Sequence, residues 1–70
     1  MAVPTFRAEY VKPLRRALHL TQHELADQLG VSQSLVAQWE RESMTPRGPA
    51  AILLSQLKSR ADLEKESVPA

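Results

Sequence analysis

The sequence of 70 residues predicts an all-α protein, a compact bundle of four to five short helices. Apolar residues recur at intervals of three and four in several segments, which is typical of amphipathic helices. β-branched and aromatic residues are sparse and do not alternate along the chain, so we expect no strands. Helix-capping residues and a glycine separate the periodic segments, which therefore form short helices rather than one long one.

A first helix is expected over residues 8–19, with an apolar stripe at helical spacing. Pro13 is compatible with this helix only in the first turn, where its missing N–H has no partner to lose. Two starts satisfy that condition. Either the ordered helix begins between Tyr10 and Pro13, or an earlier turn near Phe6 leads into it.

Two further helices are expected, over residues 22–29 and from 33 to about 42, and each has its own boundary signals. A capping box that begins at Thr21 starts the first of them. Gly30 ends it, because glycine adopts a left-handed conformation without steric cost, and Ser32 caps the next helix. Two helices joined by so short a break form a helix-turn-helix, whose second helix is shaped to enter the DNA major groove.

A loop over residues 43–48 separates the third helix from a fourth, which is expected to start at Pro49 and to run to about Arg60 or Leu63. This pattern divides the chain into three parts. Residues 1–7 are expected to form an N-terminal arm, residues 8–62 the DNA-binding domain, and residues 63–70 a flexible acidic tail.

Composition argues against several classes of protein. The chain has no cysteine, so we expect neither a disulfide framework nor a cysteine-based zinc site. No apolar run approaches the roughly 18 residues of a membrane span. His19 and His23 are four residues apart but lie on either side of a helix break, with no further ligands nearby. Because nucleotide-binding and nucleophile–base motifs are also missing, the sequence predicts no enzyme, metal or cofactor.

The third helix has one apolar face and one polar face. At about 100° per residue, Leu35, Val36 and Trp39 fall together and are expected to face the core. The opposite face has no carboxylate between Gln33 and Trp39, and its amide, hydroxyl and methyl groups suit the edges of base pairs. On an isolated helix, residues of these types are usually solvated surface side chains without a binding role. Here a capped helix and a glycine turn precede them, and this arrangement favours base reading. The predicted base-reading residues are Gln33, Ser34, Ala37 and Gln38.

Three other residues are candidates for contacts with DNA phosphates. Gln22 lies in the first turn of its helix, where free backbone N–H groups favour an anion. Arg41 and Arg47 follow the third helix. For each of them the competing interpretation is an ordinary solvated side chain. The formal net charge is only +1, but basic residues outnumber acidic ones between Phe6 and His23, so we expect a basic face on the first three helices.

Together these segments resemble the Cro/repressor-type (Xre-like) helix-turn-helix family, which includes phage, plasmid and bacterial regulators and single-domain antitoxins. The resemblance covers roughly residues 14–57 and implies a lambda-repressor-like DNA-binding fold. Gln22, Ala26 and Gly30 match the family's opening glutamine, small contact residue and turn glycine. The five apolar positions of the family are matched by Leu25, Leu29, Val31, Val36 and Trp39.

The resemblance also implies roles for particular residues. Gln33, Ser34 and Gln38 fall on base-reading positions, and Gln22 and Arg47 fall on phosphate-contacting ones. Arg15 and Glu40 match a buried pair that ties the first helix to the third, and a carboxylate at the edge of a core does need a partner. With Gly30 and Trp39, this pair is expected to be structural.

The chain departs from the family at two positions. Glu42 stands where a glycine is expected two residues after Glu40, and His19 stands where a glycine often precedes Leu20. Either the third helix runs on past the usual end or its C-cap is built differently. The positions of Arg41 and Arg47 depend on which is true.

The predicted function is that of a dimeric, sequence-specific repressor that binds a palindromic operator in double-stranded DNA. It would regulate a small operon of a phage or mobile element, such as its own. It would act in the cytoplasm of a bacterial or phage-infected cell, in association with the nucleoid and not with a membrane. The fourth helix has more apolar residues than one inward face needs, which predicts a homodimer interface. Its candidate residues are Ile52, Leu54 and Leu57. The alternatives are an antitoxin that also neutralises a toxin partner and an adaptor that does not bind DNA.

Overall fold

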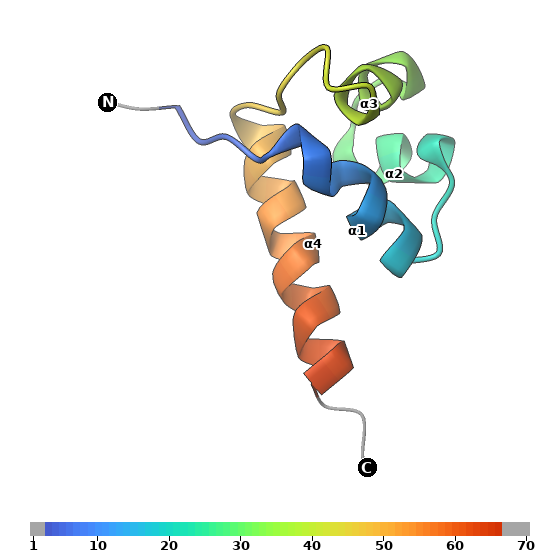
Figure 1. Cartoon of the computed structure of the whole chain (residues 1–70), viewed down its shortest axis with the longest axis vertical. Coiled ribbons are helices and arrows are strands. Elements are labelled where there is room, and N and C mark those ends of the chain that lie inside the picture. Colours follow the sequence, from blue (N-terminus) through green and yellow to red (C-terminus); the bar gives the residue numbers. More distant parts are fainter. Residues whose placement is uncertain (1–2, 67–70) are drawn as a thin grey trace.

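The computed structural model describes residues 3–66, and this part of the chain folds into a short 3-10 helix and four α-helices. The helices are η1 (Ala8–Tyr10), α1 (Val11–Ala17), α2 (Gln22–Leu29), α3 (Gln33–Glu40) and α4 (Pro49–Glu66). α1, α2 and α3 lie beside the first half of α4, whose C-terminal half extends beyond them (Figure 1). The prediction of an all-α bundle that contains a helix-turn-helix is confirmed.

Each of the four α-helices contributes side chains to one core. Val11 from α1, Leu25 from α2, Val36 and Trp39 from α3, and Leu54 from α4 are all at most 2% exposed. Burial of a side chain of this kind contributes about 1.5–3 kcal/mol to stability. The apolar face predicted for α3 therefore points inward, and this fixes the opposite face of α3 outward.

The first helix is shorter than predicted, and it is entered through a turn. η1 precedes α1, which begins at Val11 and ends at Ala17 rather than at His19. Pro13 is the third residue of α1. It therefore lies in the first turn, where no intrahelical bond is lost.

The prediction that the folded domain begins at residue 8 is wrong. Phe6 is only 7% exposed and belongs to the core. The Phe6 N–H donates to the carbonyl oxygen of Pro46 at 3.1 Å, and the Gly48 N–H donates to that of Pro4 at 2.9 Å. The segment before η1 is thus hydrogen-bonded to the α3–α4 loop, because an aromatic side chain there is better buried than left in water.

The predicted flexible tail begins too early in the chain. α4 continues to Glu66, so residues 63–66 are helical rather than part of a tail. Residues 67–70 of the predicted tail and residues 1–2 of the predicted arm lie outside the described part of the chain.

Three successive helices end in the same way, with one residue in the left-handed conformation. This residue is His19 after α1 (φ 59°), Gly30 after α2 (φ 70°) and Glu42 after α3 (φ 60°). At the end of α3, the Glu42 N–H donates to Trp39 O at 2.9 Å and the Ser43 N–H donates to Gln38 O at 3.0 Å. These two bonds are those of a Schellman motif. α3 therefore stops at Glu40 rather than at Glu42, with Glu42 in the conformation that favours glycine.

Glu42→Gly should raise the free energy of unfolding by about 0.5–1 kcal/mol, because glycine adopts positive φ without the steric penalty of a Cβ. Urea denaturation of the two proteins would measure the difference. Gly30→Ala is the matched reverse change and should destabilise, since a Cβ there meets no atom within 4 Å and only the backbone conformation opposes it. Equal stability of Glu42→Gly and the parent chain would show that this cap is not strained.

Candidate nucleic-acid interface

The start of each helix in the helix-turn-helix is fixed by side-chain caps. Thr21 Oγ1 accepts from the Glu24 N–H at 3.1 Å, and the Thr21 N–H donates to Glu24 Oε1 at 2.9 Å, which completes a capping box. Hydrogen bonds with the backbone and then the side chain of Thr21 hold the pKa of Glu24 below its usual value. Ser32 Oγ accepts from the Leu35 N–H at 3.1 Å. α2 and α3 therefore begin at defined residues, and Gly30 sets the turn between them.

The outward face of α3 carries the residues predicted to read bases. Gln33 and Ser34 in the first turn are exposed, and Ala37 and Gln38 in the second turn are half-buried. The Ser43 hydroxyl donates to the backbone carbonyl of Gln38 at 3.1 Å, which strengthens the end of the helix. The structure thus brings the four side chains onto one accessible face.

Arg15 of α1 and Glu40 of α3 form a bidentate ion pair beneath that face. Arg15 Nε lies 2.6 Å from Glu40 Oε2, and Arg15 Nη2 lies 3.1 Å from Oε1. Arg15 Nη1 also donates to Leu20 O at 2.9 Å. The two side chains are only 16% and 7% exposed. The pair therefore joins α1, the α1–α2 loop and α3.

The charge of Glu40 is stabilised by its neighbours. Burial on its own would raise the pKa of this carboxyl group. The hydrogen bonds from Arg15 and Gln22, and the positive charges of Arg15 and Lys12, outweigh burial and bring the pKa of Glu40 below its ordinary value. Glu40 is therefore a carboxylate at neutral pH, and the bond with Glu40 raises the pKa of Arg15.

Gln22 joins this ion pair to α3. Gln22 Nε2 donates to Glu40 Oε1 at 3.3 Å, and Gln22 Oε1 accepts from Gln33 Nε2 at 3.5 Å. The sequence identified Gln22 only as a candidate phosphate contact and missed both bonds. They join residues 18 and 11 positions apart, and a helical pattern does not reveal contacts over such separations.

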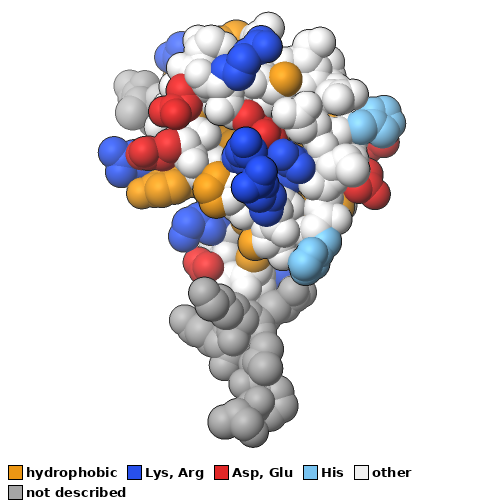
Figure 2. Space-filling model, turned by 45° about the vertical axis from the view of Figure 1, so that its right-hand side comes forward, with side chains coloured by type: hydrophobic (Ala, Val, Ile, Leu, Met, Phe, Trp, Pro, Cys, Tyr) orange, Lys and Arg blue, Asp and Glu red, His pale blue; other side chains and the backbone are white. Residues whose placement is uncertain are grey.

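Exposed basic side chains lie in the segment after α3 and on α1. Arg41 and Arg47 are exposed in the segment after the helix, and neither has an ion-pair partner within the described part of the chain. Lys12 and Arg16 are exposed on α1. Figure 2 shows Lys and Arg side chains gathered in the middle of one face of the molecule.

α4 presents an apolar surface on the side away from the core. Ile52 is 46% exposed and Leu53, which was not among the predicted interface residues, is 37% exposed. Leu57 is half-buried against the core. The prediction of Leu54 as an interface residue is wrong, because Leu54 is 0% exposed within its own chain.

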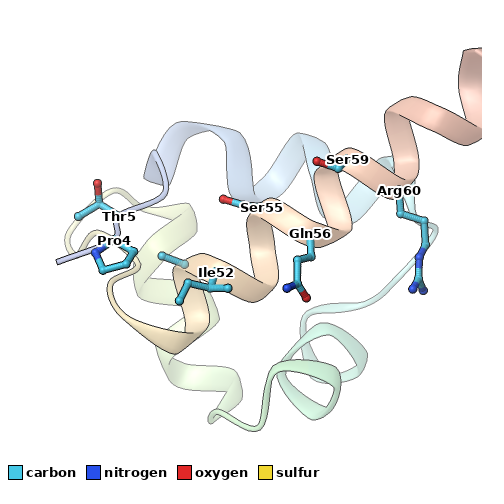
Figure 3. A pocket seen from close by; sticks show the side chains of 8 residues that line it. Pro4, Thr5, Ile52, Ser55, Gln56, Ser59 and Arg60 are labelled. Carbon is cyan, nitrogen blue, oxygen red and sulfur yellow. The ribbon is translucent and has the colours of Figure 1, made fainter. Parts of the chain in front are cut away.

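A groove runs along this surface of α4, between the helix and the N-terminal segment. Pro4 and Thr5 line it on one side, and Ile52, Gln56 and Arg60 point to the same side of α4 (Figure 3). These three α4 residues are spaced by four, so they form one ridge along the helix.

A family model described as helix-turn-helix matches residues 11–57, which is most of the chain. The chain belongs to the Cro/repressor-type helix-turn-helix family. This helix-turn-helix protein is accordingly a DNA-binding transcription regulator, as the resemblance implied. The matched range contains both members of the Arg15–Glu40 pair and all of α2 and α3. Neither a curated protein nor a solved structure was found to match the chain.

Among the described residues, no three His, Cys, Asp or Glu side chains are grouped so that they could hold a metal ion. His23 lies 3.4 Å from Asp27, a neighbour on the exposed surface of α2. Within the same part of the chain, no helix has the length and apolar character to cross a membrane.

Proposed function

We propose that this helix-turn-helix protein is a dimeric, sequence-specific repressor that binds a palindromic operator. It acts in the bacterial cytoplasm at the nucleoid, where it regulates a small operon of a phage or mobile element, its own included. The observation that carries the proposal is the outward face of α3, which presents amide, hydroxyl and methyl groups without a carboxylate. The Arg15–Glu40 pair anchors the same helix to α1.

The chemistry of this face suits the major groove. Gln33 and Gln38 can each form two hydrogen bonds with adenine, Ser34 can donate or accept, and the Ala37 methyl can pack against a thymine methyl. Gln22, Arg41 and Arg47 lie around the face and contact phosphates, which position the protein without reading sequence. Repression then follows from occupancy, because a protein on a promoter excludes other proteins from the same DNA.

A second copy of the chain supplies the rest of the specificity. One α3 helix contacts only a few base pairs, and a two-fold dimer places two such helices about 34 Å apart on a palindromic site. Ile52, Leu53 and Leu57 on α4 form the interface in this proposal, since they are the apolar side chains that remain at least partly exposed there.

Gel-shift titration tests the proposal. A duplex recovered by selection from a random pool should bind at least about a thousandfold more tightly than bulk DNA. Its affinity should fall steeply as salt rises, because bound phosphates release counterions. Gln38→Ala should reduce the preference at particular base pairs and leave the salt slope unchanged. A chain that binds the selected duplex no better than bulk DNA at low salt is not a sequence-specific repressor.

A further inference from the structure

We propose that the N-terminal segment, residues 3–7, is part of the DNA-binding surface, and that Thr5 binds the same unit of the DNA backbone as Arg47. The ligand is one deoxyribose-phosphate unit, held in a hollow between this segment and the α3–α4 loop. The inference rests on the proposed function in one respect, since Arg47 must contact a phosphate.

Two extended stretches of backbone meet at this hollow, and their side chains alternate between the core and the surface. Thr5 and Arg47 lie opposite each other in an antiparallel bridge. Their chain neighbours Phe6 and Pro46 are buried. Because successive side chains of extended backbone point to opposite sides, the burial of these two neighbours turns Thr5 and Arg47 outward. Thr45, on the other side of Pro46, is exposed as well.

The register of the bridge brings the side chains of Thr5 and Arg47 together. Its two backbone hydrogen bonds, 3.1 Å and 2.9 Å long, join the residues on either side of this pair and not the pair itself. Thr5 and Arg47 therefore form a non-hydrogen-bonded pair, in which the opposite Cα atoms lie only about 4.5 Å apart. Side chains of such a pair extend from the same side of the two strands. A group that Arg47 binds is thus within reach of the Thr5 hydroxyl.

The chemistry of the hollow matches the DNA backbone. Its volume is about 450 Å³, and it is lined by Thr5, Met44, Thr45 and Arg47, none of which is acidic. The guanidinium and hydroxyl groups are hydrogen-bond donors that suit phosphate oxygens. The side chain of Met44 is 50% exposed and offers an apolar surface to a deoxyribose ring. A free phosphate or a carboxylate would leave that apolar surface in water, whereas the DNA backbone supplies both a phosphate and a sugar.

The position of the hollow also suits the DNA backbone. The loop from Met44 to Arg47 follows the C-terminal end of α3, the helix that the proposed function places in the major groove. A helix in that groove lies between the two phosphate backbones of the duplex, so the segment after it meets one of them. The N-terminal segment is hydrogen-bonded to this loop and faces the same backbone.

Thr5→Val tests the inference, because it removes the hydroxyl group and keeps the shape of the side chain. The measurement is gel-shift affinity for selected duplexes in which one phosphate at a time is replaced by an uncharged methylphosphonate. The phosphate bound by Arg47 is the one whose replacement weakens the parent chain but not Arg47→Gln. Thr5→Val should lower the affinity for the unmodified duplex by about three- to tenfold. Most of this loss should disappear when that phosphate is neutral, and Thr5→Ser, which keeps the hydroxyl, should bind as the parent chain does.

Two further measurements separate a lost contact from other effects. The loss in Thr5→Val should be equal for all base sequences, and the salt slope should stay unchanged because no charge is removed. Arg47→Gln should instead reduce that slope by about one. Thermal denaturation should show Thr5→Val to be as stable as the parent chain, since valine suits extended backbone at least as well as threonine.

Met44→Glu tests the location of the hollow independently of the Thr5 hydroxyl. A carboxylate at this position would be repelled by the phosphates, so the affinity for every duplex should fall by at least about tenfold. Gln28→Glu is the control, because it changes the net charge equally on the exposed surface of α2. It should change the affinity by less than about twofold, since charges beyond a Debye length are screened.

The outcomes separate the two proposals. If Arg47→Gln identifies a phosphate but Thr5→Val binds as the parent chain does, or loses affinity equally with every modified duplex, the role of the N-terminal segment is overturned and the repressor proposal stands. A Met44→Glu variant that binds normally would show that the hollow faces away from DNA, with the same consequence. If Arg47→Gln identifies no phosphate, both the inference and this part of the proposed function fail.

Discussion

Arg15→Met should lower the free energy of unfolding by about 2–4 kcal/mol at pH 7, which is a large share of the total for a domain of this size. The substitution leaves the carboxylate of Glu40 buried without its main partner. It also removes the donor to Leu20 O. Thermal or urea denaturation followed by circular dichroism measures the loss.

The loss should depend on pH with a predictable sign. In the parent chain the pKa of Glu40 is below its ordinary value of 4.5, so its stabilising effect is present above pH 4.5 and is lost as pH falls through the lowered pKa. In Arg15→Met, burial dominates and raises the pKa of Glu40. The Glu40 carboxylate then destabilises the folded protein at pH 7, and this effect ends in acid because the carboxyl group is protonated there. The difference in stability between the two proteins should therefore shrink below pH 4.5.

Arg16→Met is the control, because Arg16 is an exposed arginine on the same helix. It should change stability by no more than about 0.5 kcal/mol. A loss in Arg15→Met as small as this, or one that is constant from pH 7 to pH 3, would contradict the structural importance assigned to the pair.

Ile52→Glu combined with Leu53→Glu should give a folded monomer whose operator affinity is reduced by at least about a hundredfold. Both side chains are exposed on α4, so the changes leave the core intact, whereas two carboxylates on each chain would oppose each other across a two-fold interface. Sedimentation velocity measures the oligomeric state, and gel shifts with the selected duplex measure the affinity.

Ile52→Lys combined with Leu53→Lys separates dimer loss from repulsion between protein and DNA. This variant adds positive charge, which would favour phosphate binding, yet it should also be monomeric and bind the operator weakly. If either variant remains a dimer, the interface lies elsewhere on the molecule.

Much of the fold could be predicted because its signals are local. The capping box at Thr21, the glycine turn at Gly30 and the cap at Ser32 each act within one helical turn, and the bounds predicted for α2 agree with the structure. The apolar face of α3 followed from helical periodicity alone. Residues on one helix face are determined by spacing, so the exposure of Gln33 and Ser34 could also be expected.

The features that the sequence did not predict depend on contacts between distant segments. Phe6 is buried because the chain before η1 lies against the α3–α4 loop. The bonds of Gln22 with Glu40 and Gln33 depend on how α2 meets α3. The inward position of Leu54 depends on the rotation of α4 about its axis. The sequence did not determine that rotation, because four apolar residues lie close together on this helix: Ile52, Leu53, Leu54 and Leu57.

The attachment of the N-terminal segment to the α3–α4 loop has a consequence for binding kinetics. Thr5 and Arg47 lie opposite each other in an antiparallel bridge, which is formed by the two backbone hydrogen bonds on either side of them. The backbone that carries Arg47 is therefore ordered before DNA arrives, and little backbone entropy remains to be lost when Arg47 meets a phosphate. Association should be limited by diffusion and orientation rather than by rearrangement of this loop.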